Sequence, residues 1–226
     1  KNRKKNNYDE AKKQLEAKVT EQEKLLKTKS DKLSAARKKA AKELEKSIVQ
    51  ALMDLNFLEV KFEIAFTPLE KYTSKGQDAM EFMISTNPGE PVKPLAKVAS
   101  GGEMSRIMLA IKTVMAGADE IESLIFDEID SGISGRTAQM VAEKMNVLGR
   151  NHQIICITHL PQIAAMADAH YLIEKKVENN ETHSDIYPLS SEASVRELAR
   201  MLGGVEITDA VIKNAQEMID LAKMKK

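Results

Sequence analysis

The sequence predicts an α/β fold in which a mostly parallel sheet is flanked by helices and preceded by a long coiled-coil helix. Residues 9–58 contain neither Gly nor Pro and are rich in strong helix formers. Further along, strand-like runs alternate with helical patterns, and the runs "LIF" and "IICI" are almost continuously apolar, as in parallel strands buried on both faces. We therefore expect two domains, a coiled-coil arm at 1–58 and a lobe at 59–226.

The arm has the apolar spacing of a coiled coil. A heptad seam of alternating four- and three-residue steps runs through Leu15, Val19, Gln22, Leu26, Lys29, Leu33, Ala36 and Ala40, with Gln22 and Lys29 as polar interruptions. Beyond Ala40 the steps become fours, as at a stutter where a coil enters a globular body. The 226 residues hold no second long heptad run, so we expect the partner helix to come from another chain or from sequence outside this one.

The lobe is expected to begin with a β-hairpin and then to alternate strands with helices. The expected strands are 60–66, 79–86, 123–128, 153–159, 169–177 and 184–189. The expected helices are 104–115, 135–148, 162–166 and two in the tail after Ser194. The polar side chains that follow two of these strands are then expected at the carboxyl edge of the sheet, where open α/β sheets bind ligands.

The charge of the chain is unevenly distributed. Residues 1–50 hold 16 Lys and Arg against 8 Asp and Glu, and the remaining residues hold 18 against 26. The basic half is either a solvated helix surface or an electrostatic footprint on DNA, and the sequence leaves both open. The single Cys156 and the lack of a secretory signal or a long apolar run predict a cytoplasmic protein without a membrane span.

Two carboxylates end the strand "SLIFDEID". On a sheet of the P-loop type, Asp127 would hold Mg²⁺ and Glu128 would orient or deprotonate the water that attacks a γ-phosphate. Solvated acids that merely end a strand are the alternative. The next strand ends in Thr158 and His159, and a histidine there could donate a hydrogen bond to a γ-phosphate oxygen or be structural. No spacing among the His residues and Cys156 indicates a zinc site.

A glycine pair opens the helix of "KVASGGEMSRIMLAIK". Ser100, Gly101 and Gly102 would point backbone amides, a hydroxyl and the positive end of the helix dipole at a phosphate. An ordinary N-cap followed by Glu103 is the alternative. The order of the motifs, with "DE" and then a strand-terminal His after "SGGE", favours the phosphate site.

At these positions the sequence resembles the SMC-like branch of the ABC-type ATPase heads. "ASGGE" resembles the ABC signature, "SLIFDE" the Walker B strand, "IDSGIS" the D-loop and "ITH" the switch-histidine loop. "DEID" is similar to SMC proteins and related repair proteins and departs from the "DEPT" of transporter ATPases. Ala99 replaces a common Leu of the signature, and Ser134 stands where an Asp often closes the D-loop.

The resemblance implies different roles for different groups of site residues. It implies catalytic roles for Glu128 and His159 and a Mg²⁺ ligand at Asp127. It implies contact with ATP bound by a second head for a further set, namely Ser100, Gly101, Gly102 and Glu103 of the signature and Asp130, Ser131 and Ser134 of the D-loop. ATP and Mg²⁺ are the implied cofactors.

A Walker A loop, G-x-x-x-x-G-K-[ST], is absent from the 226 residues. In the SMC-like family this loop lies in an N-terminal half, so the chain looks like the C-terminal half of a head and is not expected to hydrolyse ATP alone. The implied partners are that N-terminal half, a second copy joined through sandwiched ATP, and DNA bound largely without sequence preference. The implied protein is a bacterial, nucleoid-associated ATPase of DNA double-strand break repair and recombination.

Three alternatives remain at this point. The chain could be a structural DNA-tethering coiled-coil module with no active nucleotide site, which the basic arm would suit. It could belong to another SMC-like ATPase. A transporter ATPase subunit is disfavoured by the coiled coil and by "DEID".

Overall fold

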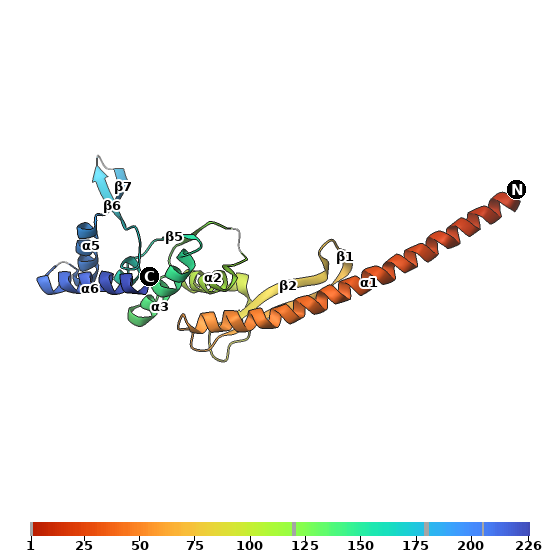
Figure 1. The fold of residues 1–226 in the computed structure, drawn as a ribbon, viewed down its shortest axis with the longest axis horizontal. Helices are drawn as coiled ribbons and strands as arrows, with labels where there is room; N and C mark the ends of the chain where they lie inside the picture. Colours follow the sequence, from red (N-terminus) through yellow and green to blue (C-terminus); the bar gives the residue numbers. More distant parts are fainter. Residues whose placement is uncertain (1, 119–120, 179–180, 205) are drawn as a thin grey trace.

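The computed structural model describes residues 2–118, 121–178, 181–204 and 206–226 of the chain. A long helix, α1 (Asn2–Met53), extends away from a lobe that holds every other element (Figure 1). The N-terminus lies at the far tip of α1, and the C-terminus lies in the lobe. The described part contains no helix long and apolar enough to cross a membrane.

Helix α1 ends at Met53, earlier than the expected residue 58. The backbone amide of Phe57 donates to the carbonyl of Leu52, and that of Asn56 donates to the carbonyl of Met53. Asn56 adopts the left-handed region, with φ 66°. This pair of bonds is a Schellman motif, which satisfies the last carbonyls and ends a helix without Gly or Pro. The expected continuation to residue 58 is therefore wrong.

A three-stranded antiparallel sheet packs along the lobe-proximal part of α1. It consists of β1 (Lys61–Thr73), β2 (Gly76–Ser85) and the short β3 (Lys93–Pro94), in the order β1-β2-β3. Polar contacts hold the helix and the hairpin together. Ser34 Oγ donates to Asp78 Oδ1 at 3.0 Å, Arg37 donates to the carbonyl of Lys75 at 2.7 Å, and the amide of Ile64 donates to Glu45 Oε1 at 2.8 Å.

The outer part of α1 is exposed on all sides from Glu10 to Lys29. Its seam residues Leu15 and Val19 expose 63% and 56% of their surface. Towards the lobe the apolar stripe turns inward, and Ile48 and Leu52 are fully buried in the core. The change of spacing in the sequence thus coincides with the entry of the helix into the lobe, while pairing in a coiled coil stays a prediction.

The central elements of the lobe build the α/β unit. They are α2 (Gly101–Met115), β4 (Ser123–Phe126), α3 (Gly135–Gly149), β5 (Gln153–Cys156) and the short α4 (Pro161–Ala164). Strands β4 and β5 pair in parallel, with Phe126 opposite Cys156. The α/β class with a parallel sheet is confirmed. The parallel part is limited to β4 and β5, because the other described strands pair antiparallel.

Both parallel strands are covered on one face only within the described residues. Leu124 and Ile154 pack against the core, whereas Ile125 and Ile155 on the opposite face are exposed. Each strand also ends earlier than expected, at Phe126 and Cys156, so the polar residues that follow lie in loops beyond the carboxyl edge.

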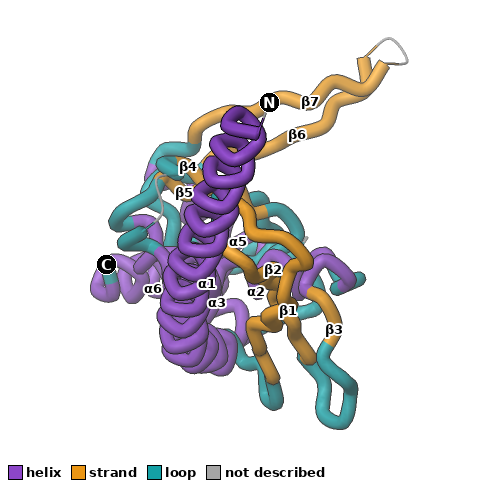
Figure 2. Tube along the Cα trace, turned by 90° about the vertical axis from the view of Figure 1, so that its right-hand side faces the viewer, coloured by secondary structure: helices purple, strands orange, loops and turns teal. Residues whose placement is uncertain are grey.

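The rest of the chain forms a hairpin and two helices. Strands β6 (Tyr171–Glu178) and β7 (Glu181–Pro188) pair antiparallel and project from the lobe in both views (Figures 1 and 2). A 3₁₀ turn, η1 (Leu95–Lys97), precedes α2, and α5 (Ser191–Gly203) and α6 (Asp209–Lys225) follow β7. The hairpin and both tail helices agree with the elements expected from the sequence.

The end of α1 provides a test of the Schellman motif. Replacing Asn56 by Ala or by Gly removes the same side-chain bond to Thr137, but only Ala meets the steric penalty of the left-handed region. We expect Asn56→Ala to lower the free energy of unfolding by about 1 kcal/mol more than Asn56→Gly does. Urea denaturation followed by circular dichroism measures both. Equal stability of the two variants would contradict this account of the helix end.

Candidate functional site

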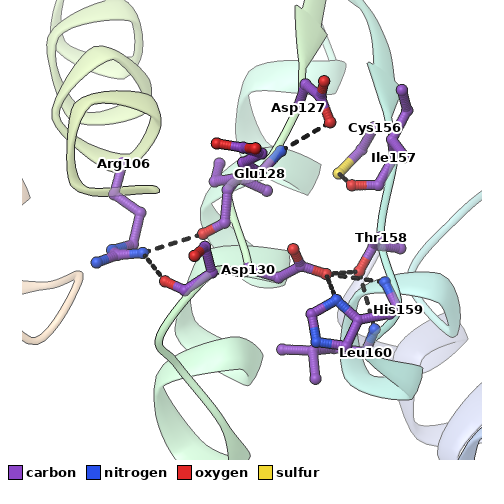
Figure 3. Close-up of polar contacts among 11 residues, drawn as sticks. Arg106, Asp127, Glu128, Asp130, Cys156, Ile157, Thr158, His159 and Leu160 are labelled. Atoms are coloured by element: carbon purple, nitrogen blue, oxygen red, sulfur yellow. Dashed lines mark hydrogen bonds and ion pairs between the residues drawn. The ribbon is translucent and has the colours of Figure 1, made fainter. Parts of the chain in front are cut away.

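The residues after β4, Asp127–Ser131, form a tight turn (Figure 3). Its first two side chains are exposed to solvent, and the next two are buried. Glu128 adopts a left-handed conformation, with φ 57°. The Asp127 carboxylate accepts a bond from the Glu128 amide at 2.9 Å, and the Ser131 amide donates to the Glu128 carbonyl at 3.0 Å. As a result Asp127 and Glu128 are exposed, whereas Ile129 and Asp130 are buried. We refer to these residues as the 127–131 turn.

The N-terminus of α2 packs directly on this turn. A Cβ atom added at Gly102 would lie 2.9 Å from the carbonyl oxygen of Ser131 and 3.0 Å from that of Glu128. A Cβ atom at Gly101 would lie 2.5 Å from Glu128 Oε2. A close approach of the chain's own backbone therefore explains Gly102, whereas at Gly101 the end of the Glu128 side chain could move aside. Ser100 caps the helix by accepting a bond from the Glu103 amide at 3.3 Å.

Two further side chains of α2 hold the turn. Ser105 Oγ donates to the carbonyl of Asp127 at 2.9 Å. The buried guanidinium of Arg106 donates to the carbonyls of Ile129 at 3.2 Å and Ser131 at 2.9 Å. Burial lowers the pKa of Arg106, yet a guanidinium remains charged at neutral pH. The sequence reasoning missed Arg106. The signal was a charged residue among the apolar residues of the buried helix face.

His159 meets the turn from the other side, after β5. Its Nδ1 lies 2.9 Å from Asp130 Oδ2, and its backbone amide donates to the same oxygen at 2.9 Å. Thr158 Oγ1 donates to that oxygen at 2.6 Å. The contacts seen among the described residues therefore join His159 to the buried Asp130, and Asp127 and Glu128 face outward nearby (Figure 3).

The other two residues expected to form a D-loop differ from Asp130 in being accessible. Ser131 and Ser134 are both exposed, and Ser134 occupies the N-cap position of α3 without a capping side-chain bond. The described residues contain no cluster of three or more metal-ligating side chains. The exposed Asp127 carboxylate is an oxygen ligand of the kind Mg²⁺ prefers, so it fits a site completed by phosphates and water rather than a protein cage.

The single Cys and two further His residues make contacts of a structural kind. Burial, together with the negative charges of Asp130 and Asp127, raises the pKa of the Cys156 thiol to about 12, so the thiol stays neutral and packs against the core. His152 bonds the carbonyl of Ile121 at 2.7 Å, and His170 bonds the Ser194 hydroxyl at 2.8 Å.

The packing around Gly101 and Gly102 predicts that alanine destabilises the protein more at Gly102 than at Gly101. We expect Gly102→Ala to lower the free energy of unfolding by about 1 to 3 kcal/mol, because the new methyl group meets backbone atoms of the turn. Gly101→Ala is expected to cost less, because the atom it meets is the movable end of the Glu128 side chain. Chemical denaturation of both variants tests this. Alanine normally favours a helix, so stabilisation by Gly102→Ala would show that the approach is not tight.

Comparisons with known proteins show what the chain is similar to. No protein-family model matches the chain. The chain is 45% identical over 218 residues to the DNA repair protein RecN of Halalkalibacterium halodurans, covering 95% of this chain and 39% of that protein. It is 42% identical over 196 residues to RecN of Bacillus subtilis, covering 82% of this chain and 34% of that protein.

A solved structure agrees at the level of the fold. The Smc head domain with a coiled coil and joint from Pyrococcus yayanosii superposes with a TM-score of 0.51 at 23% identity, covering 72% of this chain and 29% of that one. The chain thus spans well under half the length of the curated relatives it matches. Over most of its length the chain is therefore similar to the C-terminal part of the RecN proteins.

Proposed function

We propose that this chain is the signature-bearing lobe of an SMC-like ATPase that acts in DNA double-strand break repair and recombination. The observation that carries the proposal is the 127–131 turn. This one turn contacts the signature glycines through Glu128 and Ser131 and the switch histidine through Asp130. The RecN relatives, which are named DNA repair proteins, supply the biological context.

In this proposal the chain supplies half of a nucleotide site. The Walker A loop comes from the N-terminal part of the full-length protein and binds the phosphates of ATP. The carboxylate of Asp127 holds Mg²⁺, and the exposed carboxylate of Glu128 accepts a proton from the attacking water. His159 faces the γ-phosphate. When bound, Mg²⁺ neutralises the charge that develops on the phosphate oxygens.

The signature residues are proposed to act on a second head. Ser100 and Gly101 are exposed at the N-terminus of α2, so their outward side is open to a phosphate. Two heads would then close around ATP, with Glu103, Ser131 and Ser134 at the contact. Hydrolysis would separate the heads.

Uncovered apolar surfaces support a missing half. Ile125 exposes 69% of its surface on the open face of the parallel strands, and Ile155 and Ile157 are exposed with it. Leu15 and Val19 are exposed on the arm. We propose that the N-terminal half covers both surfaces. Its head portion would cover the open face of the parallel strands in the 59–226 lobe, and a helix of that half would pair with the exposed seam of the 1–58 arm.

DNA is the proposed partner of the basic arm. Lys38, Lys39 and Lys42 are exposed on α1 close to the lobe. Contacts from these lysines to phosphates would carry no base information, so the binding would be largely independent of sequence. A protein of this kind would work in the bacterial cytoplasm, associated with the nucleoid.

Reconstitution tests the proposal directly. We expect the 226-residue chain alone to show no Mg²⁺-dependent ATPase activity, and its complex with the N-terminal half of the same protein to show it. The control is the same complex with the Walker A lysine replaced by Ala. Activity of the chain alone would contradict the divided site. A complex that binds DNA but not ATP would favour a tethering module instead.

The role of Glu128 has its own test in that complex. We expect Glu128→Gln to lower the ATPase rate by about two to four orders of magnitude, because an amide cannot accept the proton of the attacking water. Binding of ATP and ATP-dependent head dimerisation should persist. Glu59→Gln, at an exposed position outside the site, is the matched control. Turnover of Glu128→Gln at the control rate would remove Glu128 from the role of base.

A further inference from the structure

Glu128 has a backbone conformation that a glutamate rarely adopts. Its φ is 57°, and among the described residues Asn56 is the only other non-glycine residue with a positive φ. The left-handed region brings Cβ close to the following carbonyl oxygen, so a residue other than Gly stays there only where its surroundings hold it. Such residues cluster in functional sites. The contacts that hold Glu128 in this conformation are therefore candidates for a functional role.

The peptide group before Glu128 is held at both of its polar atoms. Its N–H, the amide of Glu128, donates to Asp127 Oδ1 at 2.9 Å. Its carbonyl, which belongs to Asp127, accepts a bond from Ser105 Oγ of α2 at 2.9 Å. Because φ of Glu128 is the rotation about the bond that joins this peptide group to its Cα atom, the two bonds together restrict that angle.

The main chain after Glu128 is held from the same helix. The carbonyl of Glu128 accepts a bond from the Ser131 amide at 3.0 Å, which closes the turn. Arg106, the neighbour of Ser105, donates to the carbonyls of Ile129 at 3.2 Å and Ser131 at 2.9 Å (Figure 3). Successive side chains of α2 thus bond the main chain on both sides of Glu128.

We propose that Ser105 and Arg106 are positioning residues of Glu128, which keep it in the left-handed conformation and so direct its side chain to the start of α2. The carboxylate lies there, since a Cβ atom at Gly101 would be 2.5 Å from Glu128 Oε2. The consequence for catalysis rests on the proposed function, in which Glu128 is the base. A base must reach the water that it deprotonates, so a shifted turn lowers the rate of the chemical step rather than the affinity for ATP.

The conformation of Glu128 can be measured in the 226-residue chain itself. A positive φ brings the amide and α protons of a residue close together, so a strong NOE between these two protons reports it. We expect this strong NOE at Glu128 in the wild-type chain. A negative φ at Glu128 would overturn the proposal, and this result requires no variant.

Matched variants test whether the contacts from α2 are the cause. Ser105→Ala should weaken the NOE at Glu128, because it removes the donor to the preceding carbonyl. Thr113→Val should leave it unchanged, because Thr113 is also half-buried on α2 but donates to the carbonyl of Leu109 within the helix. Circular dichroism confirms that both variants fold. An unchanged NOE in a folded Ser105→Ala variant would overturn the proposal.

Kinetics of the reconstituted complex test the effect on the reaction. We expect Ser105→Ala and Arg106→Lys each to lower kcat by about 10- to 100-fold, with little change in KM for ATP. Lysine keeps the charge, but its side chain is shorter and lacks the planar guanidinium that bonds both carbonyls. Thr113→Val should keep the wild-type rate. A raised KM at an unchanged kcat would overturn the proposal.

The Glu128→Gln background separates positioning from general destabilisation. If Ser105 acts through Glu128, Ser105→Ala should slow the Glu128→Gln complex by less than about twofold, because the base that it positions is already absent. Equal losses in the wild-type and Glu128→Gln backgrounds would overturn the proposal. A wild-type complex without ATPase activity would reject the proposed function, and the NOE would then decide whether α2 holds Glu128.

Discussion

The packing of α2 on the 127–131 turn is the constraint on which the rest of the site depends. A turn that reverses at Glu128 points backbone carbonyls towards the core, and buried carbonyls need donors. Arg106 supplies two of these bonds from a buried position on α2. Gly102 lets the helix come close enough for the guanidinium to reach. Without both, Asp127 and Glu128 would not be held outward while Asp130 is held inward.

The guanidinium of Arg106 also contacts the end of helix α1. Arg106 lies over the ring of Phe57, 5.8 Å from its centroid, and Phe57 is the residue whose amide closes the Schellman motif of α1. A cation–π contact of this kind is worth about 0.5 to 2 kcal/mol, increasing as water is excluded. The chain thus has a continuous line of contact from the last turn of the arm, through α2, to the turn that carries the candidate catalytic residues.

The sequence predicted the elements well and the local geometry of the site less well. Gly-free, Pro-free helical residues and short apolar runs were sufficient to locate α1, the parallel pair and the hairpins, because these patterns reflect burial directly. The end of α1 was missed because it depends on Asn56 entering the left-handed region. The inward direction of Asp130 was missed for a similar reason, since the left-handed Glu128 breaks the alternation of a strand. Arg106 was missed although it is a charged residue on the apolar face of a helix, because its partners are main-chain carbonyls, which the sequence does not identify.

The pair Gly101 and Gly102 at the start of α2 therefore has an inner and an outer face with different requirements. The inner face needs glycine because the chain's own turn lies against it, whether or not a phosphate ever binds. The outer face, with the exposed Ser100 and Gly101 at the start of the helix, is the part that a phosphate could use. Gly101 also lies against the end of the Glu128 side chain, so the outer face of this helix end adjoins the proposed base.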